Sequence, residues 1–266
     1  MAKDTVLITG ASSGIGEALA GEFANGGCDL VLVARSEGKL HSLAEQLRAK
    51  HSVEVWVEPA DLSKRGAPKK LAGSLEEQGI EIDILVNNAG VLEHGLFVDI
   101  QAGRDQELID LNISALTGML NHFLPDMVER GRGRVLNVAS IASFQPVPSL
   151  ATYAATKAYV LSLTEALSEE LVGSGVTITA LCPGVTATNM VSSAQEKSPG
   201  MSRIPDFAIG DVAQVAKQGY RACMKGEVIS VPGVVNLATT LTGRAVPKWL
   251  LRQVSGVFGR YTAKQD

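Results

Sequence analysis

The chain has 266 residues, of which 45% are hydrophobic and 20% charged, and its formal net charge is -4 at pH 7. This length and composition favour one large α/β domain with a well-buried core over two full domains. A mildly acidic chain without a dense cluster of lysine or arginine offers no basic face for nucleic acid, so we expect no nucleic-acid partner. The N-terminus enters a predicted strand within a few residues, without the apolar stretch of a signal peptide, which predicts a cytoplasmic location.

Short runs rich in β-branched residues alternate with longer amphipathic segments, a pattern typical of a parallel sheet covered by helices on both faces. The predicted strands cover residues 6–9, 30–34, 53–58, 84–87, 134–139, 177–182 and 228–231. The clearest helical patterns cover residues 18–25, 39–50, 105–129, 152–172 and 211–225. We therefore expect a single doubly wound α/β domain with a seven-stranded parallel sheet, whose ligands bind beyond the carboxyl ends of the strands.

The first predicted strand runs straight into the glycine-rich turn Gly10-Ala11-Ser12-Ser13-Gly14-Ile15-Gly16, and a helical pattern follows. This order brings backbone amides and a helix N-terminus up to a pyrophosphate. We expect Gly10 to permit the tight turn, and Gly14 and Gly16 to leave room for a cofactor and for close packing of the helix. The spacing differs from the usual G-x-G-x-x-G fingerprint, so the motif by itself leaves a merely flexible turn open.

Further along the chain, Tyr153 precedes Lys157 by one helical turn, and Ser140 lies upstream. Residues at i and i+4 share a helix face, so a cation on Lys157 would stand beside the phenol of Tyr153. Such a cation would lower the pKa of the phenol from its usual ~10 towards neutrality. The pattern predicts a proton-transfer site, although this spacing also occurs by chance on amphipathic helices.

Three cysteines and four histidines limit the metal and redox chemistry that we expect. The cysteines are too few and too scattered for a disulfide framework or a zinc site, which predicts reduced core thiols. The histidines show no ligand spacing, so we expect surface or packing roles for them and no catalytic metal. These residues are Cys28, Cys182, Cys223, His41, His51, His94 and His122.

Six motifs occur in a fixed order: Thr9-Gly10-x-x-x-Gly14-x-Gly16, Asn87-Asn88-Ala89-Gly90, Asn112, Ser140, Tyr153-x-x-x-Lys157 and Pro183-Gly184. In order and spacing, they make the chain resemble a classical short-chain dehydrogenase/reductase from residue 5 to about residue 230. The resemblance implies a Rossmann-type domain that binds a nicotinamide dinucleotide and transfers hydride.

The same resemblance implies four catalytic residues. Tyr153 would deliver a proton to a carbonyl oxygen as hydride reaches the carbon, or remove it in the reverse direction, and Ser140 would hold that oxygen. Lys157 would favour ionisation of the phenol and bind the nicotinamide ribose. Asn112 would hold a water that links Lys157 to solvent; without the other motifs it would be an ordinary helix residue.

The resemblance also implies a cofactor site on the loops that follow the strands. Its expected residues are Gly10, Ser12, Ser13, Gly14, Ile15, Gly16, Arg35, Asp61, Leu62, Asn88, Ala89, Gly90, Tyr153, Lys157, Pro183, Gly184, Val185 and Thr188. Asp61 would cap the adenine pocket, with a simple turn aspartate as the alternative. Residues 183–188 would lie over the nicotinamide, with the Thr188 hydroxyl on its carboxamide.

The end of the second predicted strand bears on the choice of cofactor. Ala34 stands where an NAD-dependent enzyme would carry an acidic residue for the ribose hydroxyls, and Arg35 follows it. A guanidinium pairs with a 2′-phosphate through bidentate, charge-assisted hydrogen bonds, whereas a carboxylate would repel it. The sequence therefore predicts NADP(H), and a solvated Arg35 at a helix entrance is the alternative.

The substrate should be set by residues 142–151 and 189–207, both of which we expect to be loops. Their apolar side chains predict a hydrophobic ketone, aldehyde or secondary alcohol, as for a carbonyl reductase. Lys197 and Arg203 could contact an anionic carrier such as an acyl thioester, or could simply be solvated. The alternative to an enzyme is a non-catalytic dinucleotide-binding regulatory protein, which retention of Tyr153 and Lys157 disfavours.

We expect residues 1–232 to form the dinucleotide-binding and catalytic domain and residues 233–266 a cationic amphipathic extension. The uncharged stretch before Arg244 falls short of the roughly 18 apolar residues of a membrane-spanning helix. The extension should pack on the domain, over the substrate pocket, or on a neighbouring subunit of a homo-dimer or homo-tetramer. Peripheral membrane contact is the alternative.

Overall fold

The computed structural model describes residues 3–186, 210–233, 236–237 and 240. It contains a parallel seven-stranded sheet in the order β3-β2-β1-β4-β5-β6-β7. The strands are β1 (Thr5–Thr9), β2 (Asp29–Ala34), β3 (Val55–Pro59), β4 (Ile84–Asn87), β5 (Gly133–Val138), β6 (Val176–Leu181) and β7 (Ile229–Ser230). All seven predicted strands and the doubly wound α/β fold are confirmed.

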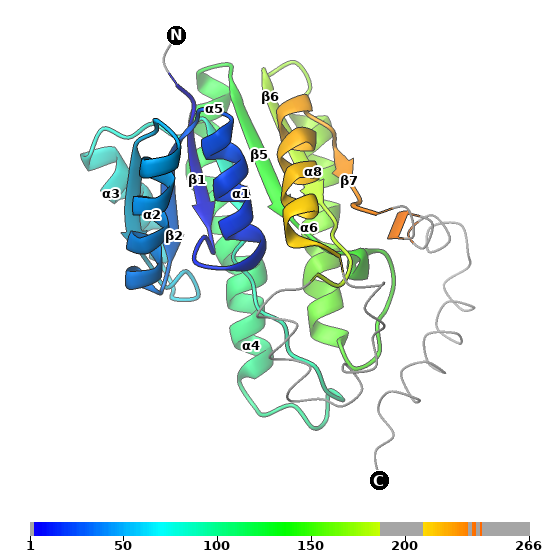
Figure 1. Cartoon of the computed structure of the whole chain (residues 1–266). Helices are drawn as coiled ribbons and strands as arrows, with labels where there is room; N and C mark the ends of the chain where they lie inside the picture. The colour runs from blue at the N-terminus through cyan, green and yellow to red at the C-terminus, as the bar shows by residue number, and fades with distance from the viewer. Residues whose placement is uncertain (1–2, 187–209, 234–235, 238–239, 241–266) are drawn as a thin grey trace.

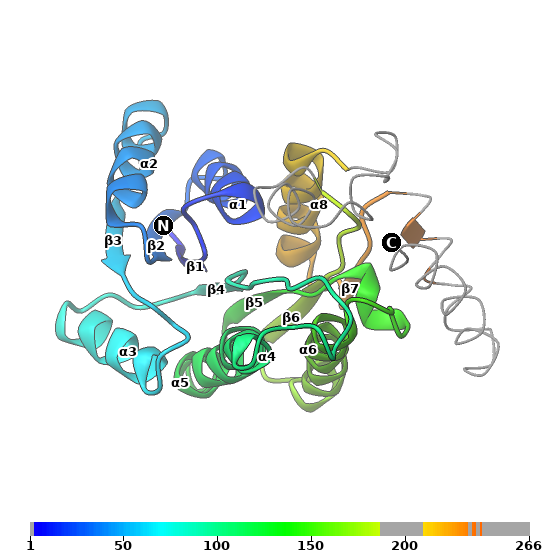
Figure 2. The ribbon, with the colours of Figure 1, turned by 90° about the horizontal axis from the view of Figure 1, so that it is seen from below.

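Helices cover both faces of the sheet (Figures 1 and 2). One face carries α1 (Gly14–Asn25), α2 (Glu37–Lys50) and α8 (Val212–Lys225). The other face carries α3 (Ala67–Glu77), α5 (Leu116–Glu129) and α6 (Ala151–Glu170). Consecutive strand residues such as Val6, Leu7 and Ile8 are all fully buried. Both sheet faces are therefore core, as continuous apolar runs in a parallel sheet require.

The structure departs from the predicted helices in two places. Helix α3 is not among the predicted helices. Its Pro68 lies in the first helical turn, where a proline is tolerated. The predicted helix over residues 105–129 is interrupted. It consists of α4 (Arg104–Ile109), a π-helical turn (Asp110–Ala115) and α5. A π turn widens the helix locally, and such turns are frequent at functional sites.

The expected loop over residues 142–151 is also corrected in part. A 3₁₀ turn covers Ile141–Phe144, and Ala151 already belongs to α6. The turn forms because the Ser140 side chain caps it, accepting a 3.1 Å hydrogen bond from the Ala142 amide. Residues 142–151, which we expect to contact the substrate, therefore start within a capped turn.

The chain changes direction across the sheet between β1 and β4. From β1 the order runs outward through β2 and β3, and from β4 it runs the other way through β5, β6 and β7. The loops after β1 and β4 therefore leave towards opposite faces, which opens a crevice at the carboxyl ends of these strands. This edge is where the predicted motifs should meet.

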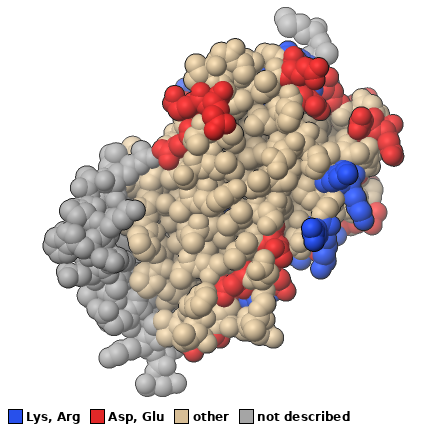
Figure 3. Space-filling view, turned by 180° about the vertical axis from the view of Figure 1, so that it is seen from behind, with Lys and Arg blue, Asp and Glu red and all other residues tan. Residues whose placement is uncertain are grey.

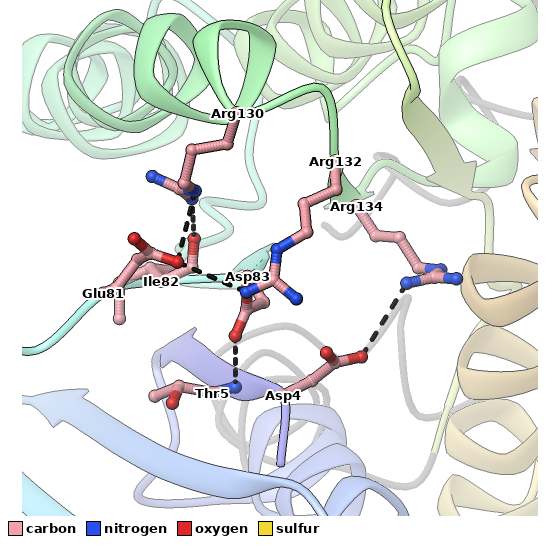
Figure 4. Close-up of polar contacts among 8 residues, drawn as sticks. All are labelled: Asp4, Thr5, Glu81, Ile82, Asp83, Arg130, Arg132 and Arg134. Atoms are coloured by element: carbon pink, nitrogen blue, oxygen red, sulfur yellow. Dashed lines mark hydrogen bonds and ion pairs between the residues drawn. The ribbon is translucent and has the colours of Figure 1, made fainter. Parts of the chain in front are cut away.

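The opposite edge, at the amino ends of β1, β4 and β5, carries a cluster of charges (Figure 4). The buried carboxylate of Asp83 accepts a 2.9 Å hydrogen bond from the Thr5 amide and lies 2.7 Å from Arg132. Glu81, by contrast, pairs at the surface with Arg130 and Arg132, each at 3.3 Å. Asp83 therefore joins β1 to β4 at the end remote from the crevice.

We predict that Asp83→Ala lowers the free energy of unfolding by roughly 1–3 kcal/mol, because the Thr5 amide loses its acceptor inside the protein. Urea unfolding followed by circular dichroism measures the change. Glu81→Ala is the control and should change the free energy far less, because its ion pairs are exposed. Equal losses in the two variants would contradict this assignment.

Candidate active site

The turn between β1 and α1 depends on three glycines. Gly10 and Gly14 have φ values of +67° and +59°, which side chains other than glycine rarely adopt. A Cβ atom on Gly16 would lie 2.3 Å from the Gly10 carbonyl oxygen and 2.4 Å from Nδ2 of Asn88. Gly16 is thus required because α1 packs directly against the turn and the end of β4.

The N-terminus of α1 keeps its amides free of side-chain caps. Ser13 is the N-cap residue, yet its side chain makes no capping hydrogen bond. Ser12, Ser13 and Ile15 are half-buried at this helix end. Uncapped amides at the positive end of a helix dipole form an anion site. The turn therefore fits the pyrophosphate of a dinucleotide.

Thr9 and Asn88 lock the loops after β1 and β4 together. The Thr9 hydroxyl donates to the Val86 carbonyl (3.2 Å) and accepts from the amides of Asn88 (2.9 Å) and Ala89 (3.0 Å). The Asn88 side chain donates to the carbonyls of Thr9 (2.9 Å) and Gly10 (3.2 Å). The expected site residues did not include Thr9, although its place before Gly10 in the first motif was a signal.

Asn112 lies in the π-helical turn and is only 1% exposed. Its side-chain amide accepts from the Val91 amide (2.9 Å) and donates to the Val91 carbonyl (3.0 Å) and the Thr156 hydroxyl (3.2 Å). A Cβ atom on Gly90 would lie 3.1 Å from Oδ1 of Asn112 and 3.5 Å from Nζ of Lys157. Asn112 thus ties the β4–α4 loop to α6. Its expected role in holding a water stays a prediction.

A serine that the sequence did not single out connects Ser140 to α6. Oγ of Ser143 accepts from the Ser140 amide (3.3 Å) and donates to the carbonyl of Lys157 (2.8 Å). Ser143 is buried. Its single hydroxyl therefore fixes the backbone of Ser140 relative to the turn of α6 that carries Lys157. Its spacing from Ser140 gave no signal, since this contact exists only once α6 packs on the 3₁₀ turn.

The predicted Tyr153 and Lys157 lie side by side on α6. Nζ of Lys157 is 5.8 Å from the centroid of the Tyr153 ring and donates a 2.8 Å hydrogen bond to the Val138 carbonyl. Lys157 is 6% exposed, and no carboxylate among the described residues pairs with it. Burial lowers the pKa of Lys157 from 10.5 to about 8. The amine therefore still carries its charge at neutral pH.

The sequence predicted a lowered pKa for Tyr153, and this prediction is wrong: in the protein without a bound ligand the pKa is raised. Burial raises the pKa of the phenol, and its hydrogen bond with the Ser140 side chain only partly opposes this. The physical reason is that burial withdraws water from a phenolate, while the Lys157 ammonium points to the Val138 carbonyl. The hydrogen bond nevertheless brings Ser140 and Tyr153 together, as predicted.

Arg35 and Asp61 lie after β2 and β3, at the same sheet edge. Arg35 is exposed. Oδ1 of Asp61 accepts from the amide (3.2 Å) and hydroxyl (2.6 Å) of Ser63. This hydrogen bonding, aided by the charge of Arg35, lowers the pKa of Asp61. Asp61 is thus a turn aspartate in the structure, and its expected contact with the adenine stays a prediction. The neighbouring Leu62 is buried in the core.

The loop after β6 approaches the Ser140 turn. The Ile141 amide donates to the Pro183 carbonyl (3.0 Å), and the Gly210 amide donates to the Val185 carbonyl (2.7 Å). A Cβ atom on Gly184 would lie 2.6 Å from Nδ2 of Asn236. Thr188, the substrate segment 189–207 with Lys197 and Arg203, and the extension from residue 241 lie outside the described residues.

All three cysteines are free and buried, as predicted. Among the residues that the structure describes, no three His, Cys, Asp or Glu side chains form a group that could hold a metal ion. Within the same residues, no helix has both the length and the apolar character needed to cross a membrane.

We predict that Lys157→Met stabilises the protein at pH 7 and that its advantage shrinks as the pH rises. The native pKa of about 8 lies below the unfolded value of 10.5, so the unfolded chain binds more protons between these values. Wild-type stability should then rise with pH across this window, by on the order of 3 kcal/mol.

Urea unfolding of both proteins at several pH values across that window measures the difference. Lys70→Met, at an exposed position on α3, reports the background effect of removing a lysine. A stability difference between Lys157→Met and wild type that stays constant with pH would refute the assignment.

Comparisons with known proteins identify the family and support the fold. The family model for short chain dehydrogenases matches residues 4–199. A short-chain dehydrogenase from Sphingobium yanoikuyae, solved in complex with NADPH, is 35% identical with a TM-score of 0.81, over 91% of this chain and 93% of that one. A short-chain dehydrogenase/reductase from Burkholderia phymatum, in complex with NAD, is 27% identical with a TM-score of 0.78, over 90% and 92% of the two chains.

A third solved structure is the bulky-bulky ketone specific alcohol dehydrogenase from Comamonas testosteroni. It is 28% identical with a TM-score of 0.76, over 99% of this chain and 95% of that one. The family match covers well over half of the chain, and the sheet order agrees with it. The chain belongs to the classical short-chain dehydrogenase/reductase family of oxidoreductases, whose members act with a nicotinamide dinucleotide cofactor.

Proposed function

We propose that the protein is an NADP(H)-dependent oxidoreductase that transfers hydride between nicotinamide and a hydrophobic ketone, aldehyde or secondary alcohol. The observation that carries the proposal is the convergence of three side chains from two segments. Ser140 hydrogen-bonds the phenol of Tyr153, and the ammonium of Lys157 lies 5.8 Å from the phenol ring. An acid, a hydrogen-bond partner and a cation so arranged suit proton transfer to a carbonyl oxygen.

In the proposed reaction, the bound dinucleotide supplies or accepts the hydride. Tyr153 gives its phenolic proton to the substrate oxygen, and Ser140 holds that oxygen beside the phenol. The developing phenolate is the form that burial disfavours, so the charge of Lys157 is needed to stabilise it. Asn112 acts as a positioning residue through Val91 and Thr156. Reversal of the same proton transfer serves alcohol oxidation.

We propose that the cofactor lies along the carboxyl edge of the sheet. The amides at the start of α1 would bind the pyrophosphate, Arg35 the 2′-phosphate and Asp61 the adenine side. The segment after β4, with Asn88, Ala89 and Gly90, would lie beneath the nicotinamide ribose near Lys157, and residues 183–185 would cover the ring. The NADPH complex of the Sphingobium relative supports this choice of cofactor, whereas the Burkholderia complex contains NAD.

We also propose self-association into a homo-dimer or homo-tetramer through α5 and α6. The face that carries these helices has a broad surface without charged side chains (Figure 3). On the side of α5 and α6 lies a hollow of about 550 Å³ with a largely apolar lining, to which Glu129 and Glu170 also contribute. Its apolar residues include Leu120, Leu124, Val128, Leu163, Leu167 and Leu171. A second copy would bury this surface, and light scattering would report the resulting mass.

Residues 1–232 would supply the whole catalytic and cofactor site, since every residue with a proposed role in this reaction lies within them. The extension 233–266 would cover the substrate pocket or a neighbouring subunit. The substrate is proposed to be a small molecule, with no nucleic-acid partner.

We predict that Tyr153→Phe lowers turnover by at least ~100-fold, because the proton donor is lost. NADPH binding should be retained, since the ring and Lys157 remain. NADPH oxidation with a panel of ketones, aldehydes and 3-oxoacyl thioesters measures turnover, and NADPH fluorescence measures binding. Substantial residual activity would assign the acid elsewhere. NADPH binding by the wild type without turnover of any panel member would favour a regulatory protein.

We predict that Arg35→Asp changes the ratio of kcat/KM for NADPH to that for NADH by ~10-fold or more in favour of NADH. The variant replaces attraction to the 2′-phosphate by repulsion, in a site that the two cofactors otherwise share. Lys50→Asp makes a similar charge change at the far end of α2 and should leave the ratio unchanged. An unchanged ratio in Arg35→Asp would mean that Arg35 faces solvent only.

A further inference from the structure

Two loops next to Tyr153 are joined by their backbones. The loop after β4 is held at Val91 by Asn112 and at Glu93 by Arg104, whose Nη2 lies 3.0 Å from Oε2 of Glu93. The Gly95 amide then donates a 2.9 Å hydrogen bond to the carbonyl of Ser149, which precedes Tyr153 by four residues. The segment from Val91 to Gly95 is thus fixed at three points: to the π-helical turn, to α4 and to the segment that leads into the catalytic helix.

Ser149 has an unusual backbone conformation. Its φ is +66°, and among the described residues it is the only non-glycine residue with a positive φ. A serine in this region is strained, and such strain persists only where the surrounding structure holds it. Here the Gly95 amide binds its carbonyl, and the following Leu150 amide donates to the Val147 carbonyl (3.1 Å).

Two buried polar atoms on these loops have no hydrogen-bond partner. They are Oγ of Ser149, in a residue that is 6% exposed, and Nδ1 of His94, the neighbour of Gly95. Buried polar atoms are nearly always paired, so an unpaired one calls for a partner that the protein itself does not supply, such as a water molecule or a ligand group. Burial lowers the pKa of His94, so its ring is neutral at pH 7 and offers one donor and one acceptor nitrogen.

The residues that follow His94 and Gly95 are apolar and exposed. Leu96, Phe97 and Val98 are 44%, 64% and 86% exposed. The other loop contributes Pro146, Val147 and Pro148 immediately before Ser149. Each unpaired polar atom thus belongs to a residue next to an apolar stretch in the sequence, and the two loops meet at the Gly95–Ser149 hydrogen bond. This arrangement suits an apolar molecule with one further polar group.

We propose that His94 and Ser149 form a polar subsite that binds a second oxygen of the substrate, remote from the reacting carbon. The preferred substrate is then a largely apolar ketone that carries a hydroxyl or a second carbonyl group. A hydroxyl can donate to one of the two side chains and accept from the other, which satisfies both unpaired atoms. The inference rests on the proposed function, because the reacting carbonyl must lie at Tyr153 for the second oxygen to reach the loops.

The experiment compares 2-nonanone with its hydroxy derivatives that carry the hydroxyl at carbons 5 to 9, each reduced with NADPH. The readout is the ratio of kcat/KM for a hydroxyketone to that for 2-nonanone, measured within one enzyme. We expect at least one hydroxyketone to be preferred by ~10-fold or more in the wild type. In Ser149→Ala and in His94→Phe this ratio should fall towards one, whatever happens to the overall rate.

Ser149→Gly is the matched control for backbone strain, because it removes the hydroxyl and suits a positive φ. If the hydroxyl binds substrate, the glycine variant loses the preference as the alanine variant does. A preference that survives in both variants of Ser149 and in His94→Phe would overturn the subsite. The same holds for a preference lost in Ser149→Ala but kept in Ser149→Gly, which would assign the effect to the turn.

The kcat/KM values of the wild type with these ketones also test the proposed subsite by themselves. Reduction of 2-nonanone and all hydroxyketones at equal efficiency would overturn the subsite while leaving the proposed function intact, with water as the partner of the two side chains. No reduction of any ketone, including the wider panel of carbonyl compounds, would instead contradict the proposed function. Circular dichroism and NADPH fluorescence of each variant verify folding and cofactor binding.

Discussion

The parallel pairing of β1 with β4 is the constraint on which the site depends. Val6, Leu7 and Ile8 pair with Ile84, Leu85 and Val86, so the two strands end side by side. The chain leaves them towards opposite faces of the sheet, and the pairing of β1 with β4 ends at Ile8 and Val86. Side chains take over at that point: the Thr9 hydroxyl and the Asn88 amide make the hydrogen bonds that the strands no longer make. The crevice keeps its shape because these bonds lie at its base.

The position of α6 follows from a second set of buried polar contacts. Nδ2 of Asn137 in β5 donates to the Thr164 hydroxyl (2.9 Å), and Lys157 donates to the Val138 carbonyl. Ser143 binds the carbonyl of Lys157 from the 3₁₀ turn. Buried and satisfied hydrogen bonds are directional, so they set the rotation of a helix more narrowly than apolar packing does. Catalytic geometry needs this rotation, because it decides whether Tyr153 faces Ser140.

Two features of the site lower the stability of the folded protein. Lys157 is buried without a carboxylate among the described residues, and burial lowers its pKa. Ser149 holds a strained backbone conformation beside an unpaired hydroxyl. Both features lie within the segment that the proposed reaction uses, whereas at the other sheet edge the Asp83 carboxylate is paired. Proteins tolerate such local conflicts where function requires them.

The sequence alone determined the seven strands of the sheet and the candidate residues that follow their carboxyl ends. Apolar runs such as Val6 to Ile8 specify strands because both faces of a parallel sheet are buried, and the spacing of Tyr153 and Lys157 specifies one helix face. Local patterns of this kind do not depend on distant residues. This is why the seven strands agree with the structure, whereas the grouping of Ser140 with Tyr153 was implied by the family resemblance.

Only the tertiary structure decided what depends on contacts between distant segments. Asn112 lies in the π-helical turn, and its side chain forms hydrogen bonds with Val91, 21 residues away. The direction of the Tyr153 pKa shift follows from how deeply the folded protein buries the phenol, which spacing does not report. Ser143, Ser149 and His94 gained their significance in the same way. A serine or histidine has no role in a linear pattern until the fold supplies its partner or leaves it buried without one.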